Sequence, residues 1–219
     1  MKSIMCFGDS NTWGFMPKLE QPTMDATNRY PFDVRWTGLL QTKLGEGYRI
    51  IEEGLNGRTT MFDCPMEDHR NGLRDIDMLL VTHTPLDLVI IMLGTNDTKL
   101  TLGMTPHVIA RGVERLIERI QTGSHGPGGA APQILVVAPI RMGAQVADRW
   151  LKGEFDASSL AKDVLLAPAF EAVARRTGAH FLDAGARITA DDADCIHMNA
   201  AGHATLAELM YDAVKGILG

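Results

Sequence analysis

Leu88-Val-Ile-Ile-Met-Leu93 is the stretch of this sequence that best indicates its fold, because every side chain in it is apolar. A strand with one solvated face alternates apolar and polar side chains, whereas a strand covered on both faces does not need to alternate. We therefore expect this segment, within an apolar run over 86–93, to be a central strand of a parallel sheet with helices on both faces.

Other apolar runs and helical patterns extend this expectation along the chain. Short runs rich in β-branched residues lie at 3–7, 48–52, 133–138 and 179–182. Apolar residues with helical spacing occur between and after these runs, at 33–44, 73–82, 106–122, 158–177 and 199–218. Strands that alternate with helices are joined by right-handed crossovers and form parallel sheets. The sequence thus predicts an α/β fold, a three-layer α/β/α sandwich around a five-stranded parallel sheet, as a single domain over residues 1–219.

The composition argues against several classes of protein. The chain has 219 residues, a formal net charge of −6 and no cluster of Lys and Arg that would attract nucleic acid or an anionic membrane. No apolar run reaches the roughly 18 residues that a membrane span needs. The three cysteines, Cys6, Cys64 and Cys195, include no Cys-x-x-Cys pair, so we expect free thiols in a reducing cytoplasm and neither a disulfide framework nor a zinc ribbon.

Two blocks far apart in the sequence carry nucleophilic chemistry. Gly8-Asp9-Ser10-Asn11-Thr12 follows the first expected strand, and Asp194-Cys195-Ile196-His197 precedes the last expected helix. A serine hydroxyl is a weak nucleophile unless a base takes its proton, and a neutral imidazole oriented by a carboxylate is such a base. We interpret Ser10, His197 and Asp194 as these groups, and a nucleophile at this position leaves no room for a signal peptide. Taken alone, the first block also fits a plain turn, and the second fits a metal-ligand pair or a helix-capping aspartate. No further acidic or histidine cluster completes a metal site.

Two further blocks offer hydrogen-bond donors. Glu53-Gly-Leu-Asn-Gly57 follows the second expected strand, and Leu93-Gly-Thr-Asn96-Asp97 follows the central one. Gly57 can turn its backbone N–H inward where a side chain would intrude, and Asn96 can point its amide N–H₂ at a developing oxyanion. Each block alone also fits an ordinary turn. Because ligands bind beyond the carboxyl ends of parallel strands, Ser10 should meet both residues at one edge of the sheet.

The order of these four blocks resembles that of the SGNH hydrolases, also called GDSL esterases. The resemblance covers the whole chain and implies a five-stranded, flavodoxin-like fold. It implies that Ser10 is the nucleophile, that His197 is the general base and that Asp194 orients His197. The oxyanion hole would consist of the backbone N–H groups of Ser10 and Gly57 and the side-chain amide of Asn96, and neither a metal nor a cofactor would be required.

The match extends to the bacterial arylesterase/acyltransferase branch of that family. The segments that carry it include Asp33-Val-Arg-Trp-Thr-Gly38, Arg58-Thr-Thr60 and Leu86-Asp-Leu-Val-Ile-Ile-Met-Leu-Gly-Thr-Asn-Asp-Thr-Lys99. The resemblance implies a serine esterase for small aryl and alkyl esters with short acyl groups, acyl transfer to alcohols or peroxide in some members, and homo-oligomers that narrow the site entrance. Branch members differ at the position of Gly57, where some carry alanine, so the balance between hydrolysis and acyl transfer stays open.

Other functions share these features. Carbohydrate acetylesterases, thioesterases and lysophospholipases use the same catalytic groups. A flavodoxin-like sheet can also bind a nucleotide or flavin without catalysis, although the chain lacks Gly-x-Gly-x-x-Gly and a Walker Gly-Lys-Ser/Thr motif.

Some residue assignments also stay open. Asp183, Asp191 and Asp192 are alternatives to Asp194 as the acid. The candidates for the walls of a substrate pocket are Trp13, Phe15, Trp150, Phe155, Ile196 and Met198.

Two long segments fit neither the strand nor the helix pattern. Residues 16–32, which are polar with three prolines, are expected to form a loop, and residues 141–156 have no assigned role.

Overall fold

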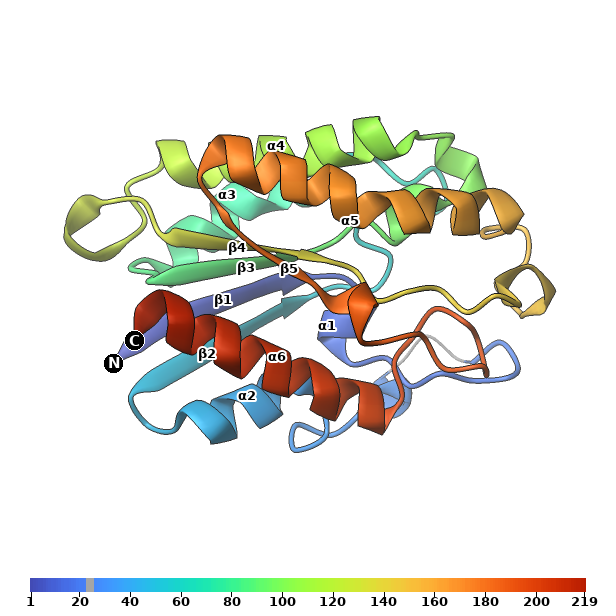
Figure 1. Cartoon of the computed structure of the whole chain (residues 1–219), viewed down its shortest axis with the longest axis horizontal. Coiled ribbons are helices and arrows are strands. Elements are labelled where there is room, and N and C mark those ends of the chain that lie inside the picture. The colour runs from blue at the N-terminus through green and yellow to red at the C-terminus, as the bar shows by residue number, and fades with distance from the viewer. Residues whose placement is uncertain (23–25) are drawn as a thin grey trace.

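The structure, a computed structural model that describes residues 1–22 and 26–219, contains a parallel sheet in the order β2-β1-β3-β4-β5 (Figure 1). Its strands are β1 (Lys2–Gly8), β2 (Tyr48–Gly54), β3 (Leu88–Met92), β4 (Gln133–Ala138) and β5 (His180–Asp183). β3 occupies the middle of the sheet and every one of its residues is buried. The prediction of a central strand covered on both faces is therefore confirmed.

Helices cover both faces of the sheet. They are α1 (Ser10–Trp13), α2 (Trp36–Leu44), α3 (Gly72–His83), α4 (Pro106–Thr122), α5 (Ala157–Thr177) and α6 (Ala200–Leu218). α2 and α6 lie on one face, and α3, α4 and α5 lie on the other (Figure 1). Short 3₁₀ turns lie in the connections, at Ala26–Asn28, Asn96–Thr98, Leu100–Leu102, Pro127–Gly129, Val146–Asp148 and Ala184–Ala186. The three-layer α/β/α architecture is as predicted.

The alternation of side chains along the strands divides the core into two layers. In β1, Met5 and Phe7 point into the cluster under α3, α4 and α5, whereas Ile4 and Cys6 point into the cluster under α2 and α6. β3 divides its side chains between the two layers in the same way. Because both layers are apolar, the central strands can be apolar along their whole length.

Local signals set most helix ends. The Thr105 hydroxyl accepts a hydrogen bond from the N–H of Val108, Pro106 takes the first helical position, and α4 ends before Gly123, as the sequence predicts. α2 begins three residues later than its expected start at residue 33, because the N–H groups of Val34 and Arg35 donate to the Pro31 carbonyl in a separate turn. The apolar spacing continues through this turn, so the pattern alone overestimates the length of the helix.

The strand register determines where the candidate residues lie. Gly8 at the end of β1 pairs with Gly54 of β2 on one side and with Met92 of β3 on the other. Ser10, Gly57 and Asn96 follow these paired residues by two, three and four positions, so all three leave the sheet at its carboxyl edge. The two ends of the chain lie side by side at the opposite edge (Figure 1).

The described residues contain neither a membrane-spanning helix nor a group of metal ligands. None of the helices in this part of the chain is long and apolar enough to cross a bilayer. Among residues 1–22 and 26–219, no three His, Cys, Asp or Glu side chains form a group that could hold a metal ion. Residues 23–25 of the expected loop over 16–32 lie outside the described residues.

Candidate active site

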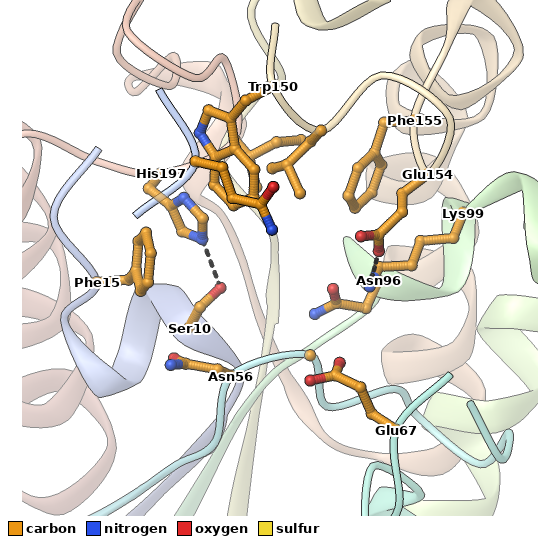
Figure 2. Close-up of a pocket in the computed structure, with 14 residues that line it drawn as sticks. Ser10, Phe15, Asn56, Glu67, Asn96, Lys99, Trp150, Glu154, Phe155 and His197 are labelled. Carbon is orange, nitrogen blue, oxygen red and sulfur yellow. Dashed lines mark hydrogen bonds and ion pairs between the residues drawn. The ribbon is translucent and has the colours of Figure 1, made fainter. Parts of the chain in front are cut away.

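Ser10 lies at the first position of α1, directly after the turn that ends β1. The Asp9 carboxylate forms the N-cap and accepts a hydrogen bond from the N–H of Asn11 at 3.0 Å. The Ser10 hydroxyl oxygen is 2.9 Å from Nε2 of His197, across 187 positions of sequence (Figure 2). Both residues are 6% exposed, so the hydroxyl and the imidazole meet at the wall of a pocket rather than on an open surface.

Asp194 holds the other side of the imidazole. Its Oδ2 lies 2.7 Å from Nδ1 of His197, and its Oδ1 accepts the backbone N–H groups of Ile196 and His197 at 3.0 and 2.9 Å. The carboxylate therefore keeps the ring proton on Nδ1 and leaves Nε2 free to accept the proton of Ser10.

The turn that makes this contact requires an unusual backbone conformation. Cys195 has φ +63°, in the left-handed region that non-glycine residues seldom adopt. Its carbonyl oxygen accepts the N–H of Gly143 at 2.9 Å, which holds the turn in place. Such a conformation costs free energy and persists where the surrounding structure fixes it.

The environment of Asp194 keeps it ionised. Burial by itself would raise the pKa of this fully buried carboxyl, but the charge and ring N–H of His197 and two backbone N–H groups outweigh burial and hold the pKa below its ordinary value. A permanent negative charge on Asp194 stabilises the imidazolium that forms when His197 takes a proton.

The three alternative aspartates do not contact the imidazole. Among the described residues, only Asp194 has a carboxylate against the His197 ring. Asp183 caps a short turn by accepting the N–H of Ala186 at 3.2 Å. Asp191 accepts the N–H of Ala193 at 2.9 Å, and Asp192 has no side-chain contact to the ring in this part of the chain.

Phe15 packs against the face of the imidazole. Its ring centroid is 4.4 Å from that of His197, and the two planes are tilted by 37° (Figure 2). The Phe15 side chain is 1% exposed, so it restricts the ring to the orientation that faces Ser10.

Hydrogen-bond donors lie on the other side of Ser10. Asn96 uses one amide hydrogen on the Arg58 carbonyl at 3.1 Å, and its amide nitrogen faces the pocket (Figure 2), where the second hydrogen is available. Gly57 has φ +77°, and a Cβ at this position would lie 2.8 Å from Oε2 of Glu67. The backbone conformation therefore favours glycine here, and a Cβ at this position would have to displace the Glu67 carboxylate.

A buried hydrogen-bond network connects the two donor loops. Both carboxylate oxygens of Asp97 accept the backbone N–H of Thr60, at 3.0 and 3.1 Å, and one accepts its hydroxyl at 2.6 Å. Burial raises the pKa of Asp97 to about 6, although the Thr60 hydroxyl and N–H favour the carboxylate. Asp9, on the nucleophile turn, also has its pKa raised to about 6 by burial, against the effects of the Asn11 N–H and the charges of His197 and Arg58. The groups that surround the reacting atoms are thus held by buried hydrogen bonds.

A cavity of about 190 Å³ opens above Ser10 and is lined by both apolar and polar side chains. Its apolar residues are Phe15, Trp150, Leu151, Phe155 and Ile196, and its polar residues beyond the triad and the donors are Gln21, Asn56, Glu67, Lys99 and Glu154. At the far side from Ser10, Lys99 Nζ and Glu154 Oε2 form an ion pair at 2.5 Å (Figure 2). Lys99 is 6% exposed, so the pair forms a polar boundary of the cavity that is buried on the lysine side.

Comparison with known proteins identifies the family. The model of the GDSL-like lipase/acylhydrolase family matches residues 6–205, which include every residue of the site just described. The chain belongs to this family. As a member of it, the protein is a carboxylic ester hydrolase, and this excludes the alternative of a non-catalytic nucleotide- or flavin-binding module.

Several solved esterase structures are similar to this chain in both sequence and fold. The carbohydrate acetylesterase Est24 from Sinorhizobium meliloti is 41% identical with a TM-score of 0.92, and an aryl esterase from M. smegmatis is 39% identical with a TM-score of 0.92. A putative arylesterase from Agrobacterium tumefaciens is 35% identical with a TM-score of 0.88. In all three cases the similarity covers 100% of both chains. A search of curated protein sequences gave no match.

Two of the residues expected to bind substrate lie outside the cavity of this GDSL-like hydrolase. Trp13 points to the Arg29 guanidinium, which lies 5.0 Å from its ring centroid and donates to the Trp13 carbonyl at 2.7 Å. Met198 is fully buried in the core layer under α6, where a Cβ added to Gly202 would lie 3.1 Å from the Met198 side chain. The third, Ile196, lines the cavity together with Phe15.

The loop over 141–156 provides pocket residues of two kinds, some that the sequence offers as candidates and some that it does not. Trp150 and Phe155 were candidates, and they reach the cavity because the segment 141–156 forms a small core of its own with Cys195 and Ile196. Lys99 and Glu154 were not expected at all. The only signal for Lys99 is its position three residues after Asn96, on the turn that leaves the central strand.

Proposed function

We propose that this family member hydrolyses short-acyl esters of small alcohols and phenols through an acyl-Ser10 intermediate. The observation that carries the proposal is the 2.9 Å contact between the Ser10 hydroxyl and Nε2 of His197 at the wall of a cavity of about 190 Å³. A serine hydroxyl within hydrogen-bond reach of a neutral, carboxylate-oriented imidazole is the arrangement that acyl transfer needs.

In the first half of the proposed reaction, Ser10 Oγ attacks the ester carbonyl while its proton passes to Nε2 of His197. The carbonyl oxygen becomes an oxyanion, which accepts hydrogen bonds from the backbone N–H groups of Ser10 and Gly57 and from the Asn96 amide. Within residues 1–22 and 26–219, neither backbone N–H group has another acceptor. The tetrahedral intermediate collapses, the C–O bond to the alcohol breaks, and the His197 imidazolium gives its proton to the leaving oxygen.

The second half repeats these steps with water. His197 takes a proton from water, the resulting hydroxide attacks the acyl carbon, and the bond to Ser10 Oγ breaks as the proton returns to the serine. An alcohol that takes the place of water gives a new ester, which is the acyl transfer that the sequence leaves open. Product analysis with an added alcohol measures the ratio of the two outcomes.

The size of the cavity supports a short acyl group. In a panel of p-nitrophenyl esters, we expect kcat/KM to fall by at least about tenfold between the acetate and the octanoate, because added methylenes have to displace well-packed aromatic side chains. Steady-state hydrolysis of the acetate, butyrate and octanoate esters measures this. A rise in kcat/KM with chain length would contradict the assignment and favour a lysophospholipase-like activity.

One observation favours a second substrate class. The polar lining residues Asn56, Glu67, Lys99 and Glu154 present hydroxyl-binding groups beside aromatic side chains, and one structure at 41% identity is that of a carbohydrate acetylesterase. Release of acetate from glucose pentaacetate, compared with phenyl acetate at equal concentration, distinguishes the two classes. Higher kcat/KM for the sugar would make deacetylation the principal activity.

Asn96→Ala tests the oxyanion hole. Removal of one preorganised donor lowers kcat by about 10²–10³-fold, and KM is expected to change little because the donor acts on charge that develops after binding. The matched control is Asn71→Ala, since Asn71 is another buried amide that donates to a backbone carbonyl (Met61, 2.9 Å) but lies outside the cavity. An effect of Asn96→Ala on KM alone would make Asn96 a substrate-binding residue.

A further inference from the structure

Asn11, the residue directly after Ser10, holds the backbone on both sides of His197. Its Nδ2 donates to the carbonyl oxygen of Ile196 at 3.2 Å, and its Oδ1 accepts the N–H of Met198 at 3.0 Å. Asn11 is 3% exposed, so water does not compete for either bond. We propose that Asn11 is a positioning residue that sets the distance between nucleophile and base, a role that rests on the function proposed above.

The rest of the histidine loop shows why this contact matters. Two aspartates also form hydrogen bonds to the backbone of residues 196–198. The Asp194 carboxylate accepts the N–H groups of Ile196 and His197, and the N–H of Asp191 donates to the His197 carbonyl at 2.9 Å. Both aspartates belong to the same loop as the histidine and move with it. Of the three residues in the described part of the chain whose side chains or backbone form these hydrogen bonds, only Asn11 belongs to the turn that carries Ser10. The amide therefore connects the two halves of the catalytic pair.

The chemistry of the side chain fits this role. An amide offers a donor and an acceptor, and the two backbone groups that flank His197 are an acceptor and a donor. Aspartate at this position would accept the N–H of Met198 but would place a negative oxygen against the Ile196 carbonyl. Leucine has a similar shape and makes neither bond, so Asn11→Leu removes the connection with little change in packing volume.

Gln41 provides a matched control at the other end of the sheet. Its Nε2 donates to the Tyr48 carbonyl at 2.9 Å, and its Oε1 accepts the N–H of Ile50 at 2.8 Å, so it also spans the two neighbours of one residue. These groups lie at the start of β2, whereas Ser10 lies beyond the strand ends. Gln41→Leu thus removes a comparable pair of hydrogen bonds, together with a longer one from Nε2 to the Gly45 carbonyl at 3.3 Å, without touching the catalytic groups.

The first experiment compares the two variants with p-nitrophenyl acetate. We expect Asn11→Leu to lower kcat by about 10- to 100-fold, as expected when reacting groups shift by a fraction of an ångström, and to leave KM within about twofold. Gln41→Leu should lower the melting temperature by a similar amount and leave kcat unchanged. Wild-type kcat in Asn11→Leu, or an equal loss of kcat in both variants, would overturn the role.

A double-mutant cycle with His197→Ala separates positioning of the base from other effects. If Asn11 acts through His197, adding Asn11→Leu to His197→Ala should cost nothing further in the residual rate. A loss that persists in that background would overturn the proposal. Where Asn11→Leu does not fold, Asn11→Asp, which keeps only the bond from Met198, enters the same cycle with the same expected result.

The cycle also distinguishes this proposal from the one on which it rests. Full activity of His197→Ala would overturn the proposed function itself. A large loss in His197→Ala together with no loss in Asn11→Leu would leave that function intact and overturn the role of Asn11 alone.

Discussion

Ser10→Ala is expected to lower kcat for p-nitrophenyl acetate by about 10⁶-fold, because the acyl-enzyme can no longer form. The hydroxyl has one hydrogen bond among the described residues, to His197, so its removal should leave the fold intact. Steady-state hydrolysis and thermal unfolding of the purified variant measure the two outcomes. A variant that unfolds as wild type does and still hydrolyses the ester at the wild-type rate would remove Ser10 from the mechanism.

The partner of Ser10 provides an internal check of this result. Residues that act as a unit in one step do not contribute additively. The double variant Ser10→Ala/His197→Ala should therefore be no slower than Ser10→Ala alone. Labelling by a fluorophosphonate probe should fail in the single and in the double variant, since both lack the Ser10 hydroxyl that the probe would modify.

Asp194→Asn is expected to lower kcat by about 10⁴-fold while the geometry stays close to that of the wild type. The amide Nδ2 would face Nδ1 of His197 and donate to it, so the ring proton would move to Nε2. That nitrogen could then no longer accept the proton of Ser10 from its position 2.9 Å away. Measurement of kcat and KM with p-nitrophenyl acetate should show the loss in kcat.

Asp183→Asn is the control for the aspartate. Its carboxylate caps a turn and does not contact the imidazole, so its replacement should change kcat by no more than about twofold. The reverse ranking, with the larger loss at Asp183, would mean that Asp194 has only a structural role in its turn.

The sequence predicted the parts of the fold that depend on local patterns. β3 was predictable because five buried side chains in succession require two covered faces. α4 was predictable because Thr105, Pro106 and Gly123 are independent end signals. α2 was predicted too long, because the turn at Pro31 continues the apolar spacing and is set by a backbone hydrogen bond that no pattern reports.

The positions of the reacting groups were predictable for a similar reason. Ser10, Gly57 and Asn96 each follow a strand end, and a parallel register brings strand ends together. Asp194 and His197 are close in sequence, so a single turn can join them.

The pocket walls were less predictable because they depend on tertiary packing. Trp13 and Met198 are close in sequence to Ser10 and His197, but both side chains lie outside the cavity. Trp150 and Phe155 reach it through a loop whose own small core fixes its path. The expected homo-oligomer and the cytoplasmic location stay predictions.

The separation of 187 positions between Ser10 and His197 has a consequence for biosynthesis. A nascent chain on the ribosome therefore carries the Ser10 hydroxyl for 187 further positions before it acquires the His197 imidazole. β1 is also an inner strand, so the turn after it has no settled neighbours until β2 and β3 have been made. Ester cleavage by this protein therefore reports only on chains that extend beyond His197, and products terminated before this residue are inactive in the same assay.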